Sequence, residues 1–355
     1  MAVYKNLDLK TYTDIRRLLH AALRIGGKYF LPIPQSSEPD ILNACENPFS
    51  VSELFVKTEY KALDELIAKH FERTTEAYLL NHLKLSNFAY TLDDELTFKY
   101  LVFSMPQTQQ MYLEKLLLLY PQMFSEPNMP IGMFCESVSY RQERVEDMIN
   151  GRHLAAFNIL DFEFNGGDNV ELAYGKLIYL LNNIVVGLGF NDNIRYIKAS
   201  DLNPNGPISS KDEASLCKDG DYSPVFITHF REIDEPFYNM EKHDDGVHFR
   251  KIDVLLPVMM PTGEIVMMEV IGSAVRTNDT QLMRERFDSI MNGAYRDKLY
   301  ELFERDRVEM ELEEYMQMVR DNSAMIRVGG GIGLQRLEAA WLTQQALDKS
   351  KQSIL

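Results

Sequence analysis

The sequence predicts an α+β protein in which an antiparallel β-sheet is flanked by helices. From Met129 onward, short runs that favour strands follow one another, and several alternate apolar and polar residues, as expected for an antiparallel sheet with one covered face. The runs are MFCESVSY, AAFNILDFEF, PVFITHF, FRKIDVLLPVMM and GEIVMMEVIG. Helical patterns interrupt them at irregular intervals, unlike the regular strand–helix alternation of a parallel sheet.

The first part of the chain is predicted to be mainly helical. Residues 9–29 carry apolar side chains at helical spacing and end at a Gly-Gly pair, which favours a helix stop. Prolines then make residues 30–39 extended. A second helix is expected at 59–84, and an extended lead-in followed by a helix at 104–120.

Three later segments are also predicted to be helical. They lie near residues 169–189, at 280–321 and at 334–347. The last one follows the sequence IRVGGGIG, in which a strand-like entry leads to a cluster of glycines.

Composition narrows the class of protein. The chain has 355 residues and a net charge of −16, which argues against broad, nonspecific binding to nucleic acid but leaves room for a local basic pocket that holds a small anion. No apolar run approaches the roughly 20 residues that span a bilayer. The N-terminus has no secretion signal, and the three cysteines are scattered singly. We therefore expect a cytoplasmic protein without a membrane partner.

One group of polar residues lies on two neighbouring predicted strands. Arg141 and Glu143 share one strand face, and Phe157, Asp161 and Glu163 share a face of the next strand because they are separated by even numbers. The pattern is compatible with a solvated face laced by salt bridges. It is also what a nucleotide site requires, since a guanidinium can hold phosphate and a flat ring can stack on a base.

The glycine cluster of VGGGIGLQR is followed by Arg336. Too little chain follows for a Rossmann unit, and no GK[ST] follows for a P-loop. Either the glycines form a tight turn, or they let a ligand approach the backbone while Arg336 binds its phosphate.

Three acidic residues, Asp253, Glu264 and Glu269, lie on or beside two predicted strands. Magnesium at a triphosphate is held by one or two carboxylates together with the phosphates. Each residue taken alone is better explained as an exposed strand residue.

Together, these segments resemble the class II aminoacyl-tRNA synthetases. YRQE…GRHLAAFNILDFEF is similar to their motif 2, and VGGGIGLQR is similar to their motif 3. QMYLE, PVFITHFREIDEPFY and EVIGSAVR resemble segments of the aspartyl/asparaginyl subgroup, and GGGIG is shared with the ammonia-dependent (asparagine synthetase A-like) enzymes. FLPIPQSS resembles a degenerate motif 1 with Pro34 as its proline.

The resemblance implies an ATP site in which Arg141 and Arg336 are the catalytic cations and Phe157 stacks on adenine. Its members are Arg141, Glu143, His153, Phe157, Gly331, Gly333 and Arg336. It also implies an amino-acid pocket formed by Gln110, Asp161 and Arg276, and a Mg²⁺ site formed by Asp253 and Glu269.

Several positions depart from the family pattern. Leu113 replaces a lysine of the aspartyl enzymes, Gln335 replaces an acid, and Ala156 replaces a glutamate. Ile326-Arg327 replaces a Pro-His pair. The separation of Asp253 from Glu269 exceeds the family norm, so either a hairpin is inserted or Glu264 is the metal ligand.

The resemblance implies a two-part chain, with a mainly helical segment at 1–98 packed on a catalytic domain at 99–355. No anticodon-binding domain is expected.

The implied activity is an ATP-dependent ligase that activates aspartate or a related amino acid as an adenylate and transfers it to ammonia or a small amine. ATP and Mg²⁺ are the expected cofactors, a homodimer is the expected assembly, and tRNA is not an expected partner. The alternatives are a paralogue that charges or modifies tRNA or protein, and a non-catalytic regulatory paralogue.

Overall fold

The computed structural model describes residues 9–33, 113–125, 130–140, 156–234, 237–260, 262–302 and 305–352. The helix predicted at 59–84 lies outside these residues, as do Pro34, Gln110, Arg141, Glu143 and His153.

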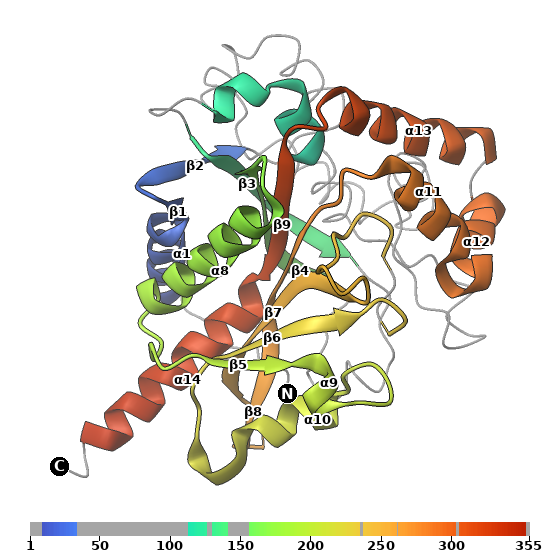
Figure 1. The fold of residues 1–355 in the computed structure, drawn as a ribbon. Coiled ribbons are helices and arrows are strands. Elements are labelled where there is room, and N and C mark those ends of the chain that lie inside the picture. Colours follow the sequence, from blue (N-terminus) through green and yellow to red (C-terminus); the bar gives the residue numbers. More distant parts are fainter. Residues whose placement is uncertain are drawn as a thin grey trace, which may run out of the picture.

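The described residues form one nine-stranded sheet with the order β1-β2-β3-β4-β9-β8-β7-β6-β5 (Figure 1). Its strands are β1 (Arg24–Ile25), β2 (Lys28–Ile33), β3 (Gly132–Tyr140), β4 (Ala156–Gly167), β5 (Arg195–Lys198), β6 (Val225–Arg231), β7 (His248–Met259), β8 (Ile265–Val275) and β9 (Ile326–Gly333). The pairs β2/β3 and β5/β6 are parallel and the others are antiparallel. The predicted α+β fold with a mainly antiparallel sheet is confirmed.

The helices that flank the sheet include those predicted within the described residues, together with α9 and α10, which were not predicted. They are α1 (Leu9–Ala22), α8 (Val170–Gly187), α9 (Ala199–Leu202), α10 (Ser210–Ala214), α11 (Thr280–Ser289), α12 (Ala294–Leu302), α13 (Arg305–Asp321) and α14 (Leu334–Gln352), with a further helix at 113–119. Side chains cap the N-termini of two helices. Asn169 accepts a hydrogen bond from the amide of Leu172 in α8, and Asp279 accepts one from the amide of Leu282 in α11.

Two sequence interpretations are wrong at glycines. The first helix ends at Ala22 rather than at residue 29, because Gly26 and Gly27, with φ of 56° and 81°, form the hairpin turn between β1 and β2. The glycine cluster at 329–333 is not a turn: it lies within β9, and α14 begins at the next residue.

One face of the sheet is covered by α1, α8 and α14, which lie together on the same side (Figure 1). Alternate residues of β4 point into this core, which explains the apolar half of the FNILDFEF pattern. The buried core side chains include Ile15, Leu19, Leu160, Phe162, Phe164, Leu177, Leu181, Ile184, Leu337 and Ala340.

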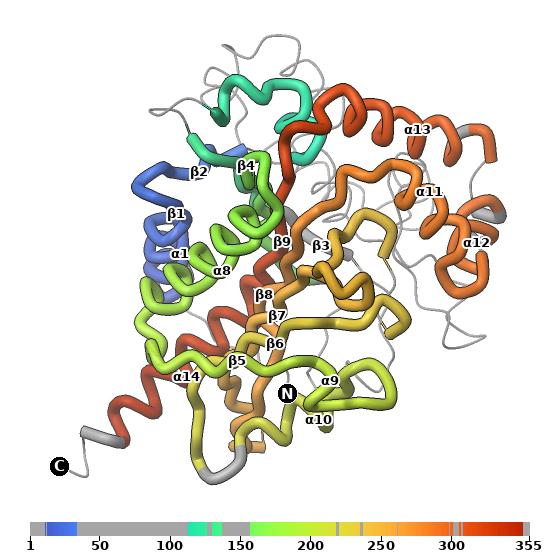
Figure 2. Tube along the Cα trace, in the orientation of Figure 1, coloured from blue at the N-terminus to red at the C-terminus, as the bar shows by residue number. Residues whose placement is uncertain are grey.

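The other face, which we call the front face, is covered at its two ends and not by one continuous layer. At one end, α11, α12, α13 and helix 113–119 pack on β2 and β3 through an apolar cluster that includes Met133 and Cys135. At the other end, α9, α10 and the turn after it pack on β6, β7 and β8. The chain runs from β8 through α11–α13 and returns along β9 (Figure 2). The front faces of β4, β9 and β8 lie between the two clusters.

No helix among the described residues is long and apolar enough to cross a membrane.

Candidate active site on the front face

A row of four paired residues crosses the middle of the front face. Asp161 of β4 pairs with Gly331 of β9, Gly331 pairs with Gly272 of β8, and Gly272 pairs with Asp253 of β7. Directly paired residues point to the same face, so two carboxylates stand at the ends and bare backbone lies between them. Three strand spacings place the two aspartate Cα atoms about 14 Å apart. We call these four residues the glycine row.

Glu269 joins Asp253 at one end of the glycine row. A Cβ atom on Gly272 would lie 2.9 Å from Glu269 Oε1 and 3.6 Å from Asp253 Oδ1, so both carboxylates reach over the same glycine. The other oxygen of Asp253 binds Lys251 Nζ at 2.8 Å. No group of three or more metal-binding side chains occurs among the residues that the structure describes. The two carboxylates over Gly272 fit an ion that takes two carboxylates from the protein and its other ligands from phosphates and water, as Mg²⁺ does.

A β-bulge brings Glu269 to the front face. Glu269 pairs with Leu255 and Ile271 pairs with Val254, which leaves Val270 as the extra residue. Val270 and Ile271 both point into the core behind the sheet. Without the bulge, Glu269 and Gly272 would lie on opposite faces.

Glu264 lies elsewhere. It is exposed in the turn between β7 and β8, where its carbonyl accepts a hydrogen bond from the amide of Met260. The long separation of Asp253 from Glu269 is therefore the length of the β7–β8 hairpin, and the alternative that Glu264 shares a metal with Asp253 does not agree with this geometry.

Two of the side chains expected to hold ATP, Phe157 and Arg336, are described, and they lie near the junction of β9 and α14. Arg336 is half-buried, and its Nη1 donates to the carbonyl of Glu269 at 2.8 Å. Gln335, which stands where the family has an acid, accepts from the amide of Asn158 at 2.8 Å, so it holds α14 against β4. Phe157 is half-buried one residue before this contact.

The two glycines expected to contact ATP differ in how much space surrounds them. A Cβ atom on Gly331 would lie 2.7 Å from Ile159 Cδ1 and 3.2 Å from Asp161 Oδ1, so no larger residue fits without a shift. A Cβ atom on Gly333 would meet only ordinary contacts of 3.7 Å and longer. Close packing on β4 thus accounts for Gly331 independently of any ligand.

At the other end, Arg276 lies among buried acids. Its Nη2 donates to Glu163 Oε1 at 3.1 Å, and its Nε lies 3.6 Å from Glu114 Oε1. Asp161 is also buried, at 2% exposure. The predicted pocket residues Asp161 and Arg276 are therefore on the same face, but the structure shows Arg276 bound to internal carboxylates.

Burial raises the pKa of two ionisable side chains here, Glu163 and Cys135. It raises the pKa of Glu163, while the charge of Arg276 counteracts that rise. Burial also raises the pKa of the Cys135 thiol, and the nearby charge of Asp161 adds to the effect. Cys135 is therefore held as a neutral thiol that packs in the apolar cluster.

Four residues near this pocket received no role from the sequence: Glu114, Glu163, Tyr315 and Arg327. The sequence offered one clue to the role of Arg327, because a buried arginine in a strand just before buried glycines requires an acidic partner. Leu113, in contrast, is fully buried in the apolar cluster of the front face.

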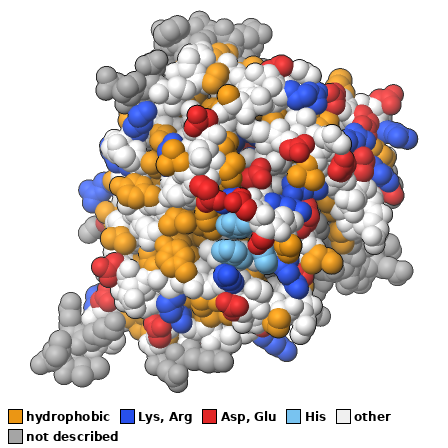
Figure 3. Space-filling view, viewed as in Figure 1, with side chains coloured by type: hydrophobic (Ala, Val, Ile, Leu, Met, Phe, Trp, Pro, Cys, Tyr) orange, Lys and Arg blue, Asp and Glu red, His pale blue; other side chains and the backbone are white. Residues whose placement is uncertain are grey.

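A second cluster of ionisable side chains lies away from the glycine row. His229 and His243 stack with ring centroids 4.4 Å apart, and His243 also contacts Tyr174 of α8. Figure 3 shows histidine side chains gathered near the middle of the face drawn there.

The family model described as tRNA synthetases class II (D, K and N) matches residues 94–349. The chain belongs to this family. No curated protein matched the chain.

Among solved structures, asparaginyl-tRNA synthetase of Entamoeba histolytica in complex with asparaginyl-adenylate is similar, with 15% identity and a TM-score of 0.52. The similarity covers 95% of this chain and 64% of that one, so this chain spans less than two thirds of its length. Asparaginyl-tRNA synthetase of Pyrococcus horikoshii, complexed with asparaginyl-adenylate, matches with 18% identity and a TM-score of 0.41, over 72% of this chain and 55% of that one. The family match and the first of these structures confirm the resemblance and the fold expected from the sequence.

Proposed function

We propose that the protein is an ATP-dependent ligase that activates aspartate or a closely related amino acid. The substrate carboxylate attacks the α-phosphorus of ATP, which forms an acyl-adenylate and releases pyrophosphate. Ammonia or a small amine then attacks the acyl carbon, which forms an amide and releases AMP and a proton. The observation that carries this proposal is the glycine row, where a carboxylate for an ammonium group and a carboxylate pair for Mg²⁺ face the same stretch of bare backbone.

Each group has a defined role in this proposal. Asp161 binds the ammonium of the amino acid, and Arg276 binds a carboxylate of it. Asp253 and Glu269 hold Mg²⁺, which neutralises phosphate charge. Arg336 binds the γ-phosphate, next to Glu269, whose carbonyl it already contacts.

The residues outside the described ranges complete the proposed site. Arg141 stabilises the charge that develops at the α-phosphate, Glu143 and His153 hold ATP, and Gln110 assists Asp161. Phe157, which is described, stacks on adenine. Catalysis then rests on positioning and on charge stabilisation more than on acid–base chemistry.

A small acceptor is supported by the overall charge. A net charge of −16 opposes the phosphate contacts on which tRNA binding depends. The second candidate is aminoacylation of tRNA, which the family match favours. The homodimer expected from the resemblance remains a prediction.

The first test measures pyrophosphate release from ATP and Mg²⁺ with a panel of amino acids, with and without ammonia and with and without bulk tRNA. We expect release that depends on aspartate and increases with ammonia. Stimulation by tRNA instead of ammonia would favour the second candidate. If titration calorimetry detects no binding of ATP at millimolar concentration, the protein does not use ATP and the proposal fails.

A matched pair of variants tests the metal site. Asp253→Asn should weaken Mg²⁺ activation strongly, because it removes one of two carboxylate ligands. Glu264→Gln should leave Mg²⁺ activation unchanged, because Glu264 lies in the hairpin turn. The apparent Mg²⁺ constant for pyrophosphate release is the measurement, and equal effects of the two substitutions would contradict the assignment.

A further inference from the structure

A buried cluster of four charges lies beside the proposed amino-acid pocket. Glu114 from helix 113–119, Glu163 from β4, Arg276 after β8 and Arg327 from β9 are exposed by 1%, 0%, 5% and 0%. The cluster contains two carboxyl groups and two guanidinium groups. Four different elements that border this end of the front face contribute one each.

The contacts within this cluster are unequal. Glu114 Oε2 accepts a hydrogen bond from Arg327 Nη1 at 2.7 Å and another from the Tyr315 hydroxyl at 2.5 Å. Its other oxygen, Oε1, accepts from Asn239 Nδ2 at 3.3 Å and lies 3.6 Å from Arg276 Nε. Arg327 and Tyr315 thus hold Glu114 in short bonds, while its contact with Arg276 is long.

Arg327 is itself firmly placed. Its Nη2 donates to the Thr277 carbonyl at 2.6 Å and to Asn278 Oδ1 at 3.2 Å. Tyr315 is fully buried in α13, so its hydroxyl cannot swing away into water. The position of the Glu114 carboxylate is therefore set by β9 and α13.

The long contact leaves Arg276 with unused hydrogen-bonding capacity. Among the described residues, the Arg276 side chain donates one hydrogen bond, to Glu163, and its buried Nε donates none. A guanidinium has five N–H groups, and it binds a carboxylate best with two of them in parallel. If Glu114 closed on Arg276 in that geometry, it would take the donors and neutralise the charge that a substrate carboxylate needs.

We propose that Arg327 and Tyr315 are positioning residues that hold Glu114 away from Arg276 and thereby keep Arg276 able to bind the carboxylate of an acidic amino acid. This inference rests on the proposed function, because it names how that pocket selects its substrate class. It also gives a specific role to Arg327, which stands where the family has a histidine. The permanent charge of Arg327 attracts Glu114 more strongly than a neutral imidazole does.

Tyr315→Phe tests the proposal with the smallest change, since it removes one hydroxyl and keeps the ring in the apolar cluster. We expect the KM for aspartate in ATP–pyrophosphate exchange to rise about tenfold, which corresponds to one charge-assisted hydrogen bond, while kcat changes less and the KM for ATP stays the same. Tyr295→Phe is the control, because Tyr295 is a buried tyrosine of the same cluster.

A second substitution separates positioning from structural damage. Glu114→Gln in the Tyr315→Phe background should return the KM for aspartate towards the wild-type value, because a neutral amide cannot neutralise Arg276. A merely structural role predicts that the double variant binds aspartate worse than the single one, and that result would overturn the proposal. An unchanged KM in Tyr315→Phe would also overturn it and would leave the proposed function intact. Wild-type protein that binds ATP but shows no aspartate-dependent exchange would overturn both.

Discussion

At Gly329, the backbone of β9 lies directly beneath the carboxyl group of Glu163. A Cβ atom there would lie 1.8 Å from Glu163 Oε1, which is impossible without moving that side chain off Arg276. We expect Gly329→Ala to lower the free energy of unfolding by about 3 kcal/mol, because it separates a buried ion pair. Gly175→Ala, in the middle of α8 with nothing within 4 Å, should instead raise it by about 0.5 to 1 kcal/mol. Urea unfolding of both variants is the measurement, and similar losses would contradict the steric argument.

At this scale, the alternation of β4 correctly predicts that Asp161 and Glu163 share a face, because side chains alternate with a period of two. The partners of Arg276 were not predictable, since Glu163 lies 113 positions away along the chain and no local pattern encodes such a contact.

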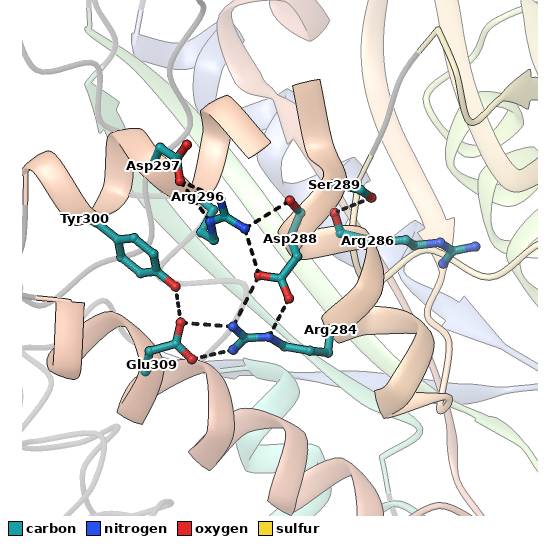
Figure 4. A network of polar contacts seen from close by, with 8 residues as sticks. All are labelled: Arg284, Arg286, Asp288, Ser289, Arg296, Asp297, Tyr300 and Glu309. Atoms are coloured by element: carbon teal, nitrogen blue, oxygen red, sulfur yellow. Dashed lines mark hydrogen bonds and ion pairs between the residues drawn. The ribbon is translucent and has the colours of Figure 1, made fainter. Parts of the chain in front are cut away.

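The helices between β8 and β9 are held together by a network of ion pairs (Figure 4). Arg284 of α11 bonds Asp288 of its own helix, with Nε to Oδ2 at 2.9 Å, and Glu309 of α13, with Nη2 to Oε1 at 3.1 Å. Tyr300 of α12 donates a hydrogen bond to the same Glu309.

Because the Arg284 side chain is 34% exposed, solvent screens these ion pairs, and Arg284→Ala should lower the free energy of unfolding by only about 1 kcal/mol. Arg17→Ala removes an exposed ion pair, in which Arg17 Nη2 lies 3.6 Å from Asp14 Oδ1, and it should cost less than about 0.3 kcal/mol. Thermal unfolding in low and in high salt measures the difference between the two losses of stability, which should become smaller as the salt concentration rises. A loss in Arg284→Ala that does not depend on salt would mean that the aliphatic part of the Arg284 side chain stabilises α13.

The same helices show what sequence patterns resolve at the scale of elements. Residues 280–321 are predicted as one helix, and the segment is helical, but it breaks at Ile290–Gly293. Met291 and Asn292 adopt positive φ there, and neither residue type marks such a break reliably. The strands β3, β4, β6, β7 and β8 were placed well, because their alternation reflects which side faces the core. In contrast, β1 falls within the helix predicted at 9–29, and β5 was not predicted. The bulge that turns Glu269 to the front face could not be predicted, because it depends on the pairing of two strands and not on either strand alone.

At the scale of the whole molecule, the first and last described helices, α1 and α14, contact each other behind the sheet. Glu136 of β3 forms an ion pair with Arg16 of α1 and also contacts His20 of α1 at 2.8 Å. Glu338 of α14 lies near this group and is exposed by only 3%. Its Oε1 is buried and has no hydrogen-bond partner among the described residues. Burial raises the pKa of Glu338 to about 7, against a partial offset from Arg16, and Glu136 raises it further.

Stability should therefore depend on pH through Glu338. Between its ordinary pKa of 4.5 and the raised value of about 7, the folded protein keeps a proton that the unfolded chain has released. The free energy of unfolding then falls as pH rises, by up to about 1.4 kcal/mol per pH unit, and the loss is complete above pH 7. Glu338→Gln mimics the protonated acid, so it should stabilise the protein by about 3 kcal/mol at pH 8 and by much less at pH 5. Urea unfolding at the two pH values measures this, with Glu264→Gln in the exposed turn as the control. A gain of equal size at both pH values would show that Glu338 is ionised in the folded protein, and that Arg16 compensates its charge better than its burial indicates.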